Sequence, residues 1–305
     1  MYAIEVTNLR KSYGKVEALK GISFKVKEGS ITAILGANGS GKTTTIKSIC
    51  NLIIPDGGEV KLLGENNKRK MKHIAALFEG TRNLYWRLTP AENLRYFAGI
   101  RGLGGAAIEK RIDELLEMFN LSAKKNVPVN NLSKGMQQKV AIAMALICDT
   151  EIILLDEPTL GLDVESVMQI KELLQRISRE MHKTIFLSTH DLKVVESICD
   201  DVIILSKGTV VAQDSVKSLI SNYQCFTYEI NLAEGFLQHT EFITSQEGWY
   251  LNQEEGKLQI DIYSLEELYE IIATLKDRGI FIREIKEKTL DLERVFLKLV
   301  RAEVV

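Results

Sequence analysis

The chain contains 305 residues, of which 45% are hydrophobic and 26% are charged, and its formal net charge at pH 7 is −2. This length suits one large and one small domain, or two moderate ones, each with a buried core, and so small a net charge supplies no basic field to attract nucleic acid or anionic lipid. The longest apolar run, VAIAMALIC at 140–148, is far shorter than the roughly 20 residues that span a bilayer. Because the N-terminus also lacks the apolar core of a signal peptide, we expect neither a transmembrane segment nor a signal peptide.

The first predicted elements surround a glycine-rich loop. The N-terminal stretch MYAIEVTNLRKSYG alternates like a strand, and ITAIL at 31–35 is typical of a buried strand. Residues 36–43 then read GANGSGKT and fit the phosphate-loop pattern G-x-x-x-x-G-K-[ST]. A helical pattern follows, with Ile46, Ile49 and Cys50 on one face. A glycine-rich turn with a lysine by chance is the alternative, but strand, loop and helix occur in the order that phosphate binding requires.

The residues of this loop have the properties that bind a polyphosphate. Gly36, Gly39 and Gly41 permit backbone conformations closed to larger residues, so amide groups can approach phosphate oxygens closely. The N-terminus of the following helix adds partial positive charge. We expect Lys42 to contact the outer phosphates and the Thr43 hydroxyl to join the coordination shell of Mg²⁺.

The next segment, from about residue 80 to 150, is predicted to be helical. Within it, NLSKGMQQK at 131–139 opens a helix near Ser133 and Gly135. One interpretation makes Ser133 an N-cap that opens a buried helix. The other makes both residues part of an anion site at a helix N-terminus. The two interpretations can hold together, because a cap and an anion site use the same groups.

Two later strands end in polar side chains. An apolar strand ends in Asp156 and Glu157, and KTIFLST at 183–189 predicts another, which His190 follows. Ligands of open α/β sheets bind at the carboxyl ends of the strands. We therefore predict that Asp156 holds Mg²⁺, that Glu157 polarises an attacking water, and that His190 reaches the terminal phosphate. Alone, these patterns are more often a strand-to-loop turn and a surface histidine; the phosphate loop upstream favours the functional interpretation.

After about residue 215 the composition changes, and residues 216–305 are predicted to form a small α+β domain. Its predicted strands are CFTYEINL, GWYLN, KLQIDIY and IFIREIKEKT. A helix over 264–279 has Ser264 and Glu267 as a capping box and Gly279 as its stop, and a second helix covers 289–300. The domain shows no phosphate loop, His/Cys cluster or paired carboxylates, so we predict no chemistry for it.

With these motifs in this order, residues 1 to about 215 resemble the ATP-binding cassette (ABC) ATPase family. ILLDE at 153–157 matches its Walker B motif, GLD at 161–163 its D-loop and STH at 188–190 its switch histidine. Tyr13 matches the aromatic residue that stacks on adenine. The match to the Walker A loop implies nucleotide contacts from Gly36, Ala37, Asn38, Gly39, Ser40, Gly41, Lys42, Thr43 and Thr44.

LSKGMQQK fills the place of the family signature, usually written LSGGQ. In the family this signature binds the nucleotide held by the opposite subunit. The resemblance therefore implies a head-to-tail dimer, formed with itself or with a paralogous ATPase subunit. In that dimer Ser133 and Gly135 of one subunit would contact the ATP of the other.

The signature and one other position depart from the family pattern. Lys134 replaces the first signature glycine and Met136 the glutamine, and Glu79 stands where the family usually carries another glutamine. A glutamate oxygen can still reach Mg²⁺ but adds a charge, so the implied metal ligands are Thr43, Asp156 and Glu79. A solvated loop carboxylate is the alternative for Glu79. Both departures are familiar in the branch of the family that works with ABC-2-type exporters.

The resemblance implies an α/β fold with two domains. Residues 1–215 are expected to form a P-loop NTPase ABC ATPase core, in which residues from about 80 to 150 make a helical subdomain. Residues 216–305 are expected to form a small C-terminal α+β accessory domain.

The implied activity is hydrolysis of ATP with Mg²⁺, with Lys42, Glu157 and His190 as the catalytic residues. The implied place is the cytoplasmic face of the cell membrane, where the chain would drive export through a separate multi-span ABC-2-type permease. Tyr85 and Trp86 are hypothesised to line the groove that receives this permease, or else to be buried against the core. The alternatives are the ATPase of an importer and a soluble ABC ATPase without a role in transport.

Overall fold

The computed structural model of the protein divides into two compact units, Met1–Val216 and Lys217–Val305. The helix predicted over 289–300 lies largely outside the described residues. The structure describes residues 1–66, 68–80, 83–222, 226–233, 235–246, 249–262 and 264–288, together with 292, 293, 296 and 299.

The first unit is built around a six-stranded sheet of order β5-β6-β7-β3-β8-β9. All neighbouring strands are parallel except β9, which pairs antiparallel with β8. The central strands are fully buried, as their unbroken apolar sequences predict. Because β6, β7 and β3 are neighbours, their carboxyl ends meet at one edge. The strand bounds are β3 (Ile31–Leu35), β5 (Ile74–Leu77), β6 (Ile152–Asp156), β7 (Thr184–Thr189), β8 (Asp201–Ser206) and β9 (Thr209–Ser215).

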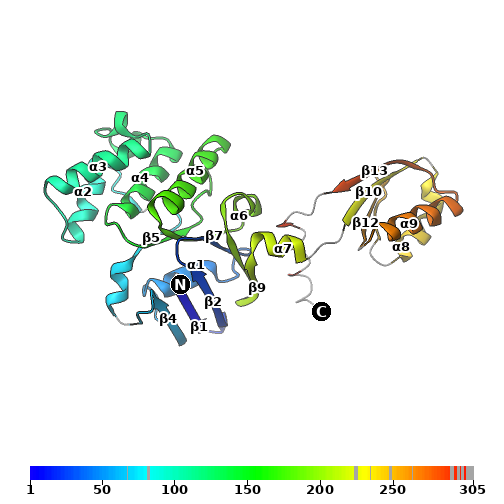
Figure 1. The fold of residues 1–305 in the computed structure, drawn as a ribbon, viewed down its shortest axis with the longest axis horizontal. Coiled ribbons are helices and arrows are strands. Elements are labelled where there is room, and N and C mark those ends of the chain that lie inside the picture. The colour runs from blue at the N-terminus through cyan, green and yellow to red at the C-terminus, as the bar shows by residue number, and fades with distance from the viewer. Residues whose placement is uncertain are drawn as a thin grey trace. The chain divides into compact units, whose positions relative to one another are not determined.

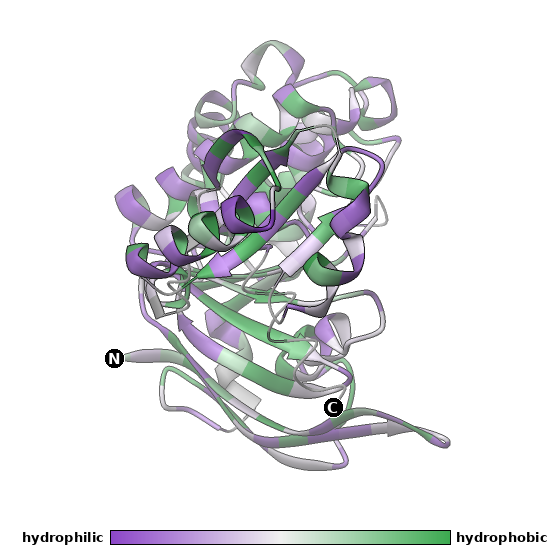
Figure 2. Cartoon of the chain, turned by 90° about the vertical axis from the view of Figure 1, so that its right-hand side faces the viewer, coloured by the Kyte–Doolittle hydropathy of each residue, from purple (hydrophilic) through white to green (hydrophobic). Residues whose placement is uncertain are grey.

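A three-stranded antiparallel sheet of order β2-β1-β4 packs beside this sheet. The helix α1 (Lys42–Ile49) contacts β2 on one side and β6 and β7 on the other. Ile46 and Ile49 of α1 are fully buried in the core cluster that joins the two sheets. In Figure 2 much of the green of hydrophobic residues lies on strands, while the helices are banded purple and green. The strand bounds are β1 (Tyr2–Tyr13), β2 (Val16–Lys27) and β4 (Gly57–Leu62).

Helices α2 (Pro90–Ile100), α3 (Ala106–Met118) and α4 (Lys134–Leu146) gather at one end of this unit, opposite β1, β2 and β4 (Figure 1). A capping box starts α2: the Glu92 amide donates to the Thr89 hydroxyl at 3.3 Å, and the Thr89 amide donates to the Glu92 carboxylate at 2.8 Å. The first unit also contains α5 (Val164–Met181) and α6 (Leu192–Ile198). Helix α7 (Val216–Asn222) begins at the boundary between the two units.

The second unit is a four-stranded antiparallel sheet of order β11-β12-β10-β13 with two helices over one face. Its element order, β-α-β-β-α-β, is that of the ferredoxin-like fold. The predicted helix is α9, capped by the Ser264 hydroxyl, and Gly279 follows it with φ 72°. The prediction missed α8, which has only six residues. The bounds are β10 (Phe226–Leu232), α8 (Thr240–Ser245), β11 (Trp249–Asn252), β12 (Lys257–Ile262), α9 (Leu265–Asp277) and β13 (Ile282–Lys288).

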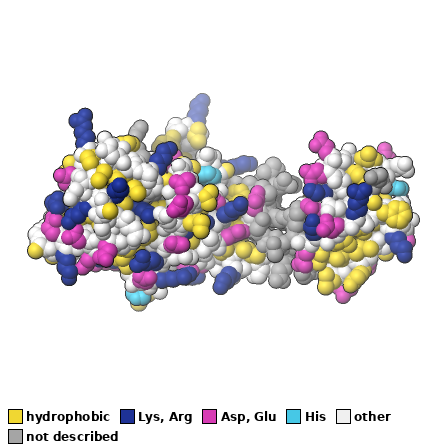
Figure 3. Space-filling model, turned by 90° about the horizontal axis from the view of Figure 1, so that it is seen from above, with side chains coloured by type: hydrophobic (Ala, Val, Ile, Leu, Met, Phe, Trp, Pro, Cys, Tyr) yellow, Lys and Arg dark blue, Asp and Glu magenta, His cyan; other side chains and the backbone are white. Residues whose placement is uncertain are grey.

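The surface carries both signs of charge. Figure 3 shows Lys and Arg side chains interspersed with Asp and Glu side chains on the visible face of each unit. Over the ranges that the structure describes, every helix is too short or too polar to span a bilayer.

Candidate functional site

The glycines of the phosphate loop meet two different constraints. Gly36 has no room for a side chain, because a Cβ there would lie 2.3 Å from the Leu205 carbonyl oxygen and 2.6 Å from the Ser40 hydroxyl. Gly39 and Gly41 instead have φ angles of 81° and 110°, which larger residues rarely adopt. The loop therefore holds its backbone in a shape that depends on glycine at all three positions.

Lys42, the first residue of α1, is buried among oxygen atoms. Its Nζ donates hydrogen bonds to the carbonyls of Gly36 at 2.7 Å and Ala37 at 3.4 Å. It also lies 3.5 Å from Oε1 of Glu157, and the side chains of both residues are over 90% buried, at 6% and 7% exposure. A buried cation at a helix N-terminus, inside a loop of backbone amides, is suited to bind phosphate oxygens.

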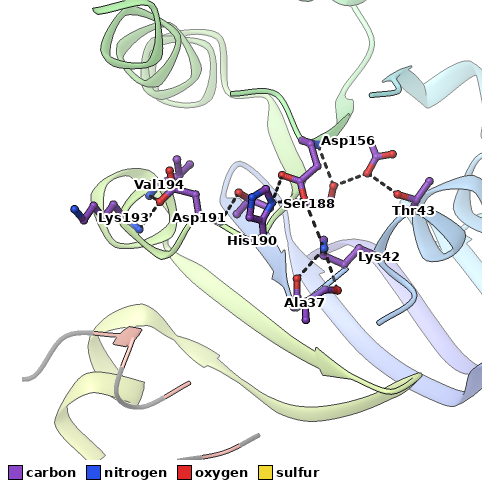
Figure 4. Close-up of polar contacts among 12 residues, drawn as sticks. Ala37, Lys42, Thr43, Asp156, Ser188, His190, Asp191, Lys193 and Val194 are labelled. Atoms are coloured by element: carbon purple, nitrogen blue, oxygen red, sulfur yellow. Dashed lines mark hydrogen bonds and ion pairs between the residues drawn. The ribbon is translucent and has the colours of Figure 1, made fainter. Parts of the chain in front are cut away.

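Asp156 joins the phosphate loop to the two central strands (Figure 4). Its Oδ1 accepts hydrogen bonds from the Ser188 hydroxyl at 2.5 Å and the Thr43 hydroxyl at 3.1 Å. Its Oδ2 is buried and has no hydrogen-bond partner among the described residues. Burial, and to a lesser extent the charge of Asp156, raise the pKa of the nearby Cys50 thiol to about 12. An unpaired carboxylate oxygen beside a hydroxyl fits the oxygen ligands that Mg²⁺ prefers.

Glu157 is held in an unusual conformation at the end of β6. Its φ is 50°, which is uncommon for a residue other than glycine and marks strain that functional sites often contain. Its amide donates to the carbonyl and to the hydroxyl of Ser188, at 3.2 and 3.0 Å. Both of its carboxylate oxygens lie 3.0 Å from Nδ1 of His190, whose side chain is 46% exposed. A buried carboxylate thus faces a half-exposed histidine.

These residues surround a cavity of about 530 Å³, which we call the nucleotide cavity. Most of the predicted nucleotide contacts line it, together with Glu157 and His190. Three predicted contacts, Gly36, Ala37 and Ser40, lie in the loop but are not among its lining residues, and Ser40 is buried. The lining residues are Tyr13, Ala18, Asn38, Gly39, Gly41, Lys42, Thr43, Thr44, Glu79, Glu157, Leu160 and His190.

The signature residues do not line the nucleotide cavity of their own chain. Ser133 is the N-cap of α4, and its hydroxyl accepts a hydrogen bond from the Met136 amide at 3.3 Å. Gly135 is buried against α5, where a Cβ would lie 2.2 Å from the Ser166 hydroxyl. That hydroxyl is fixed by Asp163, whose own pKa is lowered by hydrogen bonds from the amide and hydroxyl of Ser166. Gly135 is therefore required for close packing of the two helices.

A second hollow, about 220 Å³ and here called the groove, lies between the loop after β5 and the start of α4. Glu79, Glu157 and Leu160 line both the groove and the nucleotide cavity. Lys134 and Asp156 line the groove but not the nucleotide cavity. The exposed carboxylate of Glu79 consequently stands at the boundary between the two spaces.

Ser188 is a site residue that the sequence analysis left without a role. Its hydroxyl donates to the Asp156 carboxylate, and its hydroxyl and carbonyl accept from the Glu157 amide, so it fixes the carboxylate of Asp156 and the backbone of Glu157. The parallel pairing of β6 and β7 places Ser188 directly opposite Asp156. A buried serine near the carboxyl end of an otherwise apolar strand was the available signal, but its partner depends on the strand register.

The sequence matches known proteins along its whole length. The family model described as ABC transporter matches residues 19–160. The ABC transporter ATP-binding protein NatA of Bacillus subtilis (strain 168) is 40% identical over 208 residues, which are 67% of this chain and 84% of that protein. The bacitracin transport ATP-binding protein BcrA of Enterococcus faecalis is 30% identical over 303 residues, 98% and 96% of the two chains. The methionine import ATP-binding protein MetN 1 of Bacillus cereus (strain ATCC 10987 / NRS 248) is 35% identical over 236 residues, 73% and 68%.

Solved structures share the fold of the first unit. CbiO1 of Clostridium perfringens, part of the ABC transporter complex cbiONQ, matches with a TM-score of 0.67 and 30% identity over 72% of this chain and 91% of that chain. The ATP-binding cassette MJ0796, a dimer in a post-hydrolysis state with ADP and Pi, matches with a TM-score of 0.62 and 33% identity over 70% and 98%. The expected α/β fold, a P-loop ABC ATPase core with a helical subdomain, is confirmed.

The phosphate loop, the paired acidic strand end and these similarities agree on one family and one activity. The chain belongs to the ABC transporter family as an ATP-binding subunit that hydrolyses ATP with Mg²⁺.

Proposed function

We propose that this subunit drives export through a separate multi-span permease of the ABC-2 type, from the cytoplasmic face of the membrane. The observation that carries the direction is the extent of the likeness to BcrA, which includes the second unit, whereas the match to the methionine importer covers 73% of this chain. Glu79 and the LSKGM signature, which resemble the exporter branch, support the same direction.

For the chemical step we propose a role for each buried group. Lys42 and the loop amides stabilise the charge of the transferring phosphoryl group. Glu157 orients and polarises the attacking water, and His190 keeps that carboxylate and the terminal phosphate in position. Thr43, Asp156 and Glu79 hold Mg²⁺, which neutralises phosphate charge when bound. Tyr13, which is 48% exposed at the rim of the cavity, stacks on adenine.

The second subunit completes the nucleotide site in this proposal. Ser133 and Gly135 do not line the nucleotide cavity of their own chain, yet they lie in the first turn of α4, where Ser133 is exposed and the helix N-terminus is suited to bind an anion. The MJ0796 cassette, which is dimeric with ADP and Pi bound, supports a dimer of the first units. Two chains related by a two-fold axis would each supply these residues to the other's ATP.

The aromatic residues beside the groove are proposed as the permease contact. Tyr85 and Trp86 are 47% and 44% exposed, which disfavours the alternative of burial in the core. The Tyr85 hydroxyl donates to the Tyr96 hydroxyl at 3.0 Å, and the rings meet edge to face at 4.7 Å. A half-exposed aromatic cluster of this kind marks a surface that a partner covers.

Replacing Glu79 with glutamine tests its role as a metal ligand. The variant keeps an oxygen donor but removes a negative charge from the edge of the nucleotide cavity. We expect the Mg²⁺ concentration at half-maximal ATPase activity to rise about threefold to tenfold, because a neutral amide binds Mg²⁺ more weakly than a carboxylate. Titration of ATPase activity with Mg²⁺ measures this, with Glu59→Gln on the exposed strand β4 as the control. An unchanged Mg²⁺ dependence would show that Glu79 is a solvated loop carboxylate and not a metal ligand.

Replacing Ser188 with alanine tests its support of the Asp156 carboxylate and the Glu157 backbone. The change removes the hydrogen bond that the hydroxyl donates to Asp156 and the one that it accepts from the Glu157 amide. We expect kcat to fall about tenfold to a hundredfold, since a buried hydrogen bond to a carboxylate and a contact that orients Glu157 are lost at the reacting centre. Ser178→Ala, which removes a buried hydroxyl far from the cavity, controls for loss of stability. Equal kcat in the two variants would remove Ser188 from the site.

Transport in vesicles tests the direction. The chain is co-expressed with a candidate multi-span permease of the ABC-2 type, and ATP-dependent accumulation of labelled bacitracin and of labelled methionine is measured in inside-out and right-side-out vesicles. Export predicts ATP-dependent movement of cargo into inside-out vesicles, abolished by Glu157→Gln. ATP-dependent uptake into right-side-out vesicles, or dependence on an added substrate-binding protein, would identify an importer instead.

A further inference from the structure

The last strand of the second unit, β13 (Ile282–Lys288), is an edge strand of the sheet that the described residues form. It lies at the end of the sheet order β11-β12-β10-β13 and pairs with β10 alone among the strands that the structure describes. Such an edge presents a row of backbone donors and acceptors to any strand of matching register. The question is therefore what kind of strand would match it.

Residues 283–287 of β13 are exposed, and charged side chains flank the apolar Ile285. Glu284 and Lys286 lie on either side of Ile285, which is 37% exposed. The pairing with β10 places Glu284 and Lys286 on the polar face, opposite Asn231 and Glu229, and Ile285 on the face of Ile230. Within the strand, Lys286 Nζ lies 2.9 Å from Glu284 Oε2.

This sequence is complementary to itself when a second copy runs antiparallel. With Ile285 opposite Ile285 of the second copy, Glu284 stands opposite the second copy's Lys286, and Lys286 stands opposite its Glu284. The polar face then carries a ring of four alternating charges, and the next positions, 283 and 287, are again Arg opposite Glu. Directly opposite residues of unlike charge stabilise an antiparallel pair.

We propose that the second unit of this chain pairs with a second copy of the same chain, edge to edge through β13 about a two-fold axis at Ile285. Charge on an edge strand often serves only to prevent association. That purpose needs no symmetry, and like charges would serve it best. Here the order Glu-Ile-Lys places opposite charges on the two sides of Ile285. An antiparallel copy of the same strand therefore meets each charge with its opposite.

This interface is separate from the proposed ATP-bound dimer of the first units, and it deepens that proposal by making the partner a second copy rather than a paralogue. It needs no nucleotide, because none of its residues lies in the nucleotide cavity. The two associations can therefore fail independently, which the experiment exploits by omitting ATP and Mg²⁺.

Sedimentation equilibrium of the full chain without nucleotide measures the dimer. Glu284→Lys gives a strand with two lysines and Lys286→Glu a strand with two glutamates, so each variant alone faces like charge across the two-fold axis. We expect each variant to raise the dissociation constant of the dimer about tenfold, since two symmetric cross-strand pairs become repulsive. Lys257→Glu on the inner strand β12, an exposed lysine of the same sheet, is the matched control and should leave it unchanged.

Mixing the two single variants separates pairing between chains from the contact within one chain. The lysine strand of one variant is complementary to the glutamate strand of the other, so the mixture should form a heterodimer with affinity near that of the unmodified chain. The contact between positions 284 and 286 within each chain stays broken in this mixture. A monomeric unmodified chain, insensitivity to both single changes, or a mixture no tighter than its components would each overturn the proposal. ATPase activity, measured in parallel, reports on the first unit alone.

Discussion

Replacing Glu157 with glutamine is expected to reduce ATP turnover by about a hundredfold to ten-thousandfold, the range that a positioned general base contributes. Glutamine has the same shape and can keep contacts with His190 and Lys42, but it cannot take a proton from water. ATP binding should be retained, and it should tighten, because a buried negative charge is removed near the phosphates. Single-turnover hydrolysis and nucleotide binding, measured separately, distinguish the two effects.

The matched control for this variant is Glu151→Gln, at the other end of β6. The Glu151 side chain is 55% exposed, and its carboxylate lies 3.2 Å from Nδ1 of His73, remote from the nucleotide cavity. Its turnover should stay within about twofold of the unmodified chain. Near-normal hydrolysis by Glu157→Gln would show that another group activates the water, and the strained conformation of Glu157 would then need a different reason.

Replacing Gly135 with alanine is expected to give the second largest loss. A Cβ there would lie 2.2 Å from the Ser166 hydroxyl and 2.8 Å from its Cβ, well below a van der Waals contact. Either α4 moves away from α5 or the Ser166 side chain turns and its hydroxyl loses the hydrogen bond to Asp163. We expect a loss of about 1–3 kcal/mol in the free energy of unfolding, as for other overpacked sites. ATPase activity should fall at least tenfold, because the signature loop is displaced.

A second variant separates packing from phosphate binding. Ser166→Gly combined with Gly135→Ala removes the clash. The midpoint temperature of thermal unfolding of the double variant should therefore be close to that of the Ser166→Gly single variant. If the Gly135 amide contacts the partner's ATP as proposed, ATP-driven dimerisation should remain impaired in the double variant. Full recovery of both stability and dimerisation would limit Gly135 to a packing role.

The local parts of the site could be predicted from the sequence because each depends on neighbouring residues. The phosphate loop needs glycine at Gly39 and Gly41 for backbone reasons that any chain would share, and the strand before it and helix after it follow from apolar patterning. Ser133 as an N-cap is likewise a property of a few consecutive residues. The family resemblance rested on the same local motifs in order.

What only the tertiary structure decided depends on residues far apart in the chain. The hydrogen bonds from Ser188 exist because β6 and β7 are neighbours in one register, and a shift of one residue would turn its side chain away from Asp156. The need for Gly135 arises where α4 meets Ser166 on α5, a contact that neither helix encodes alone. The edge position of β13 follows from the strand order of the second unit. A sequence pattern specifies which face of an element is buried, but its partner is chosen by the packing of the whole domain.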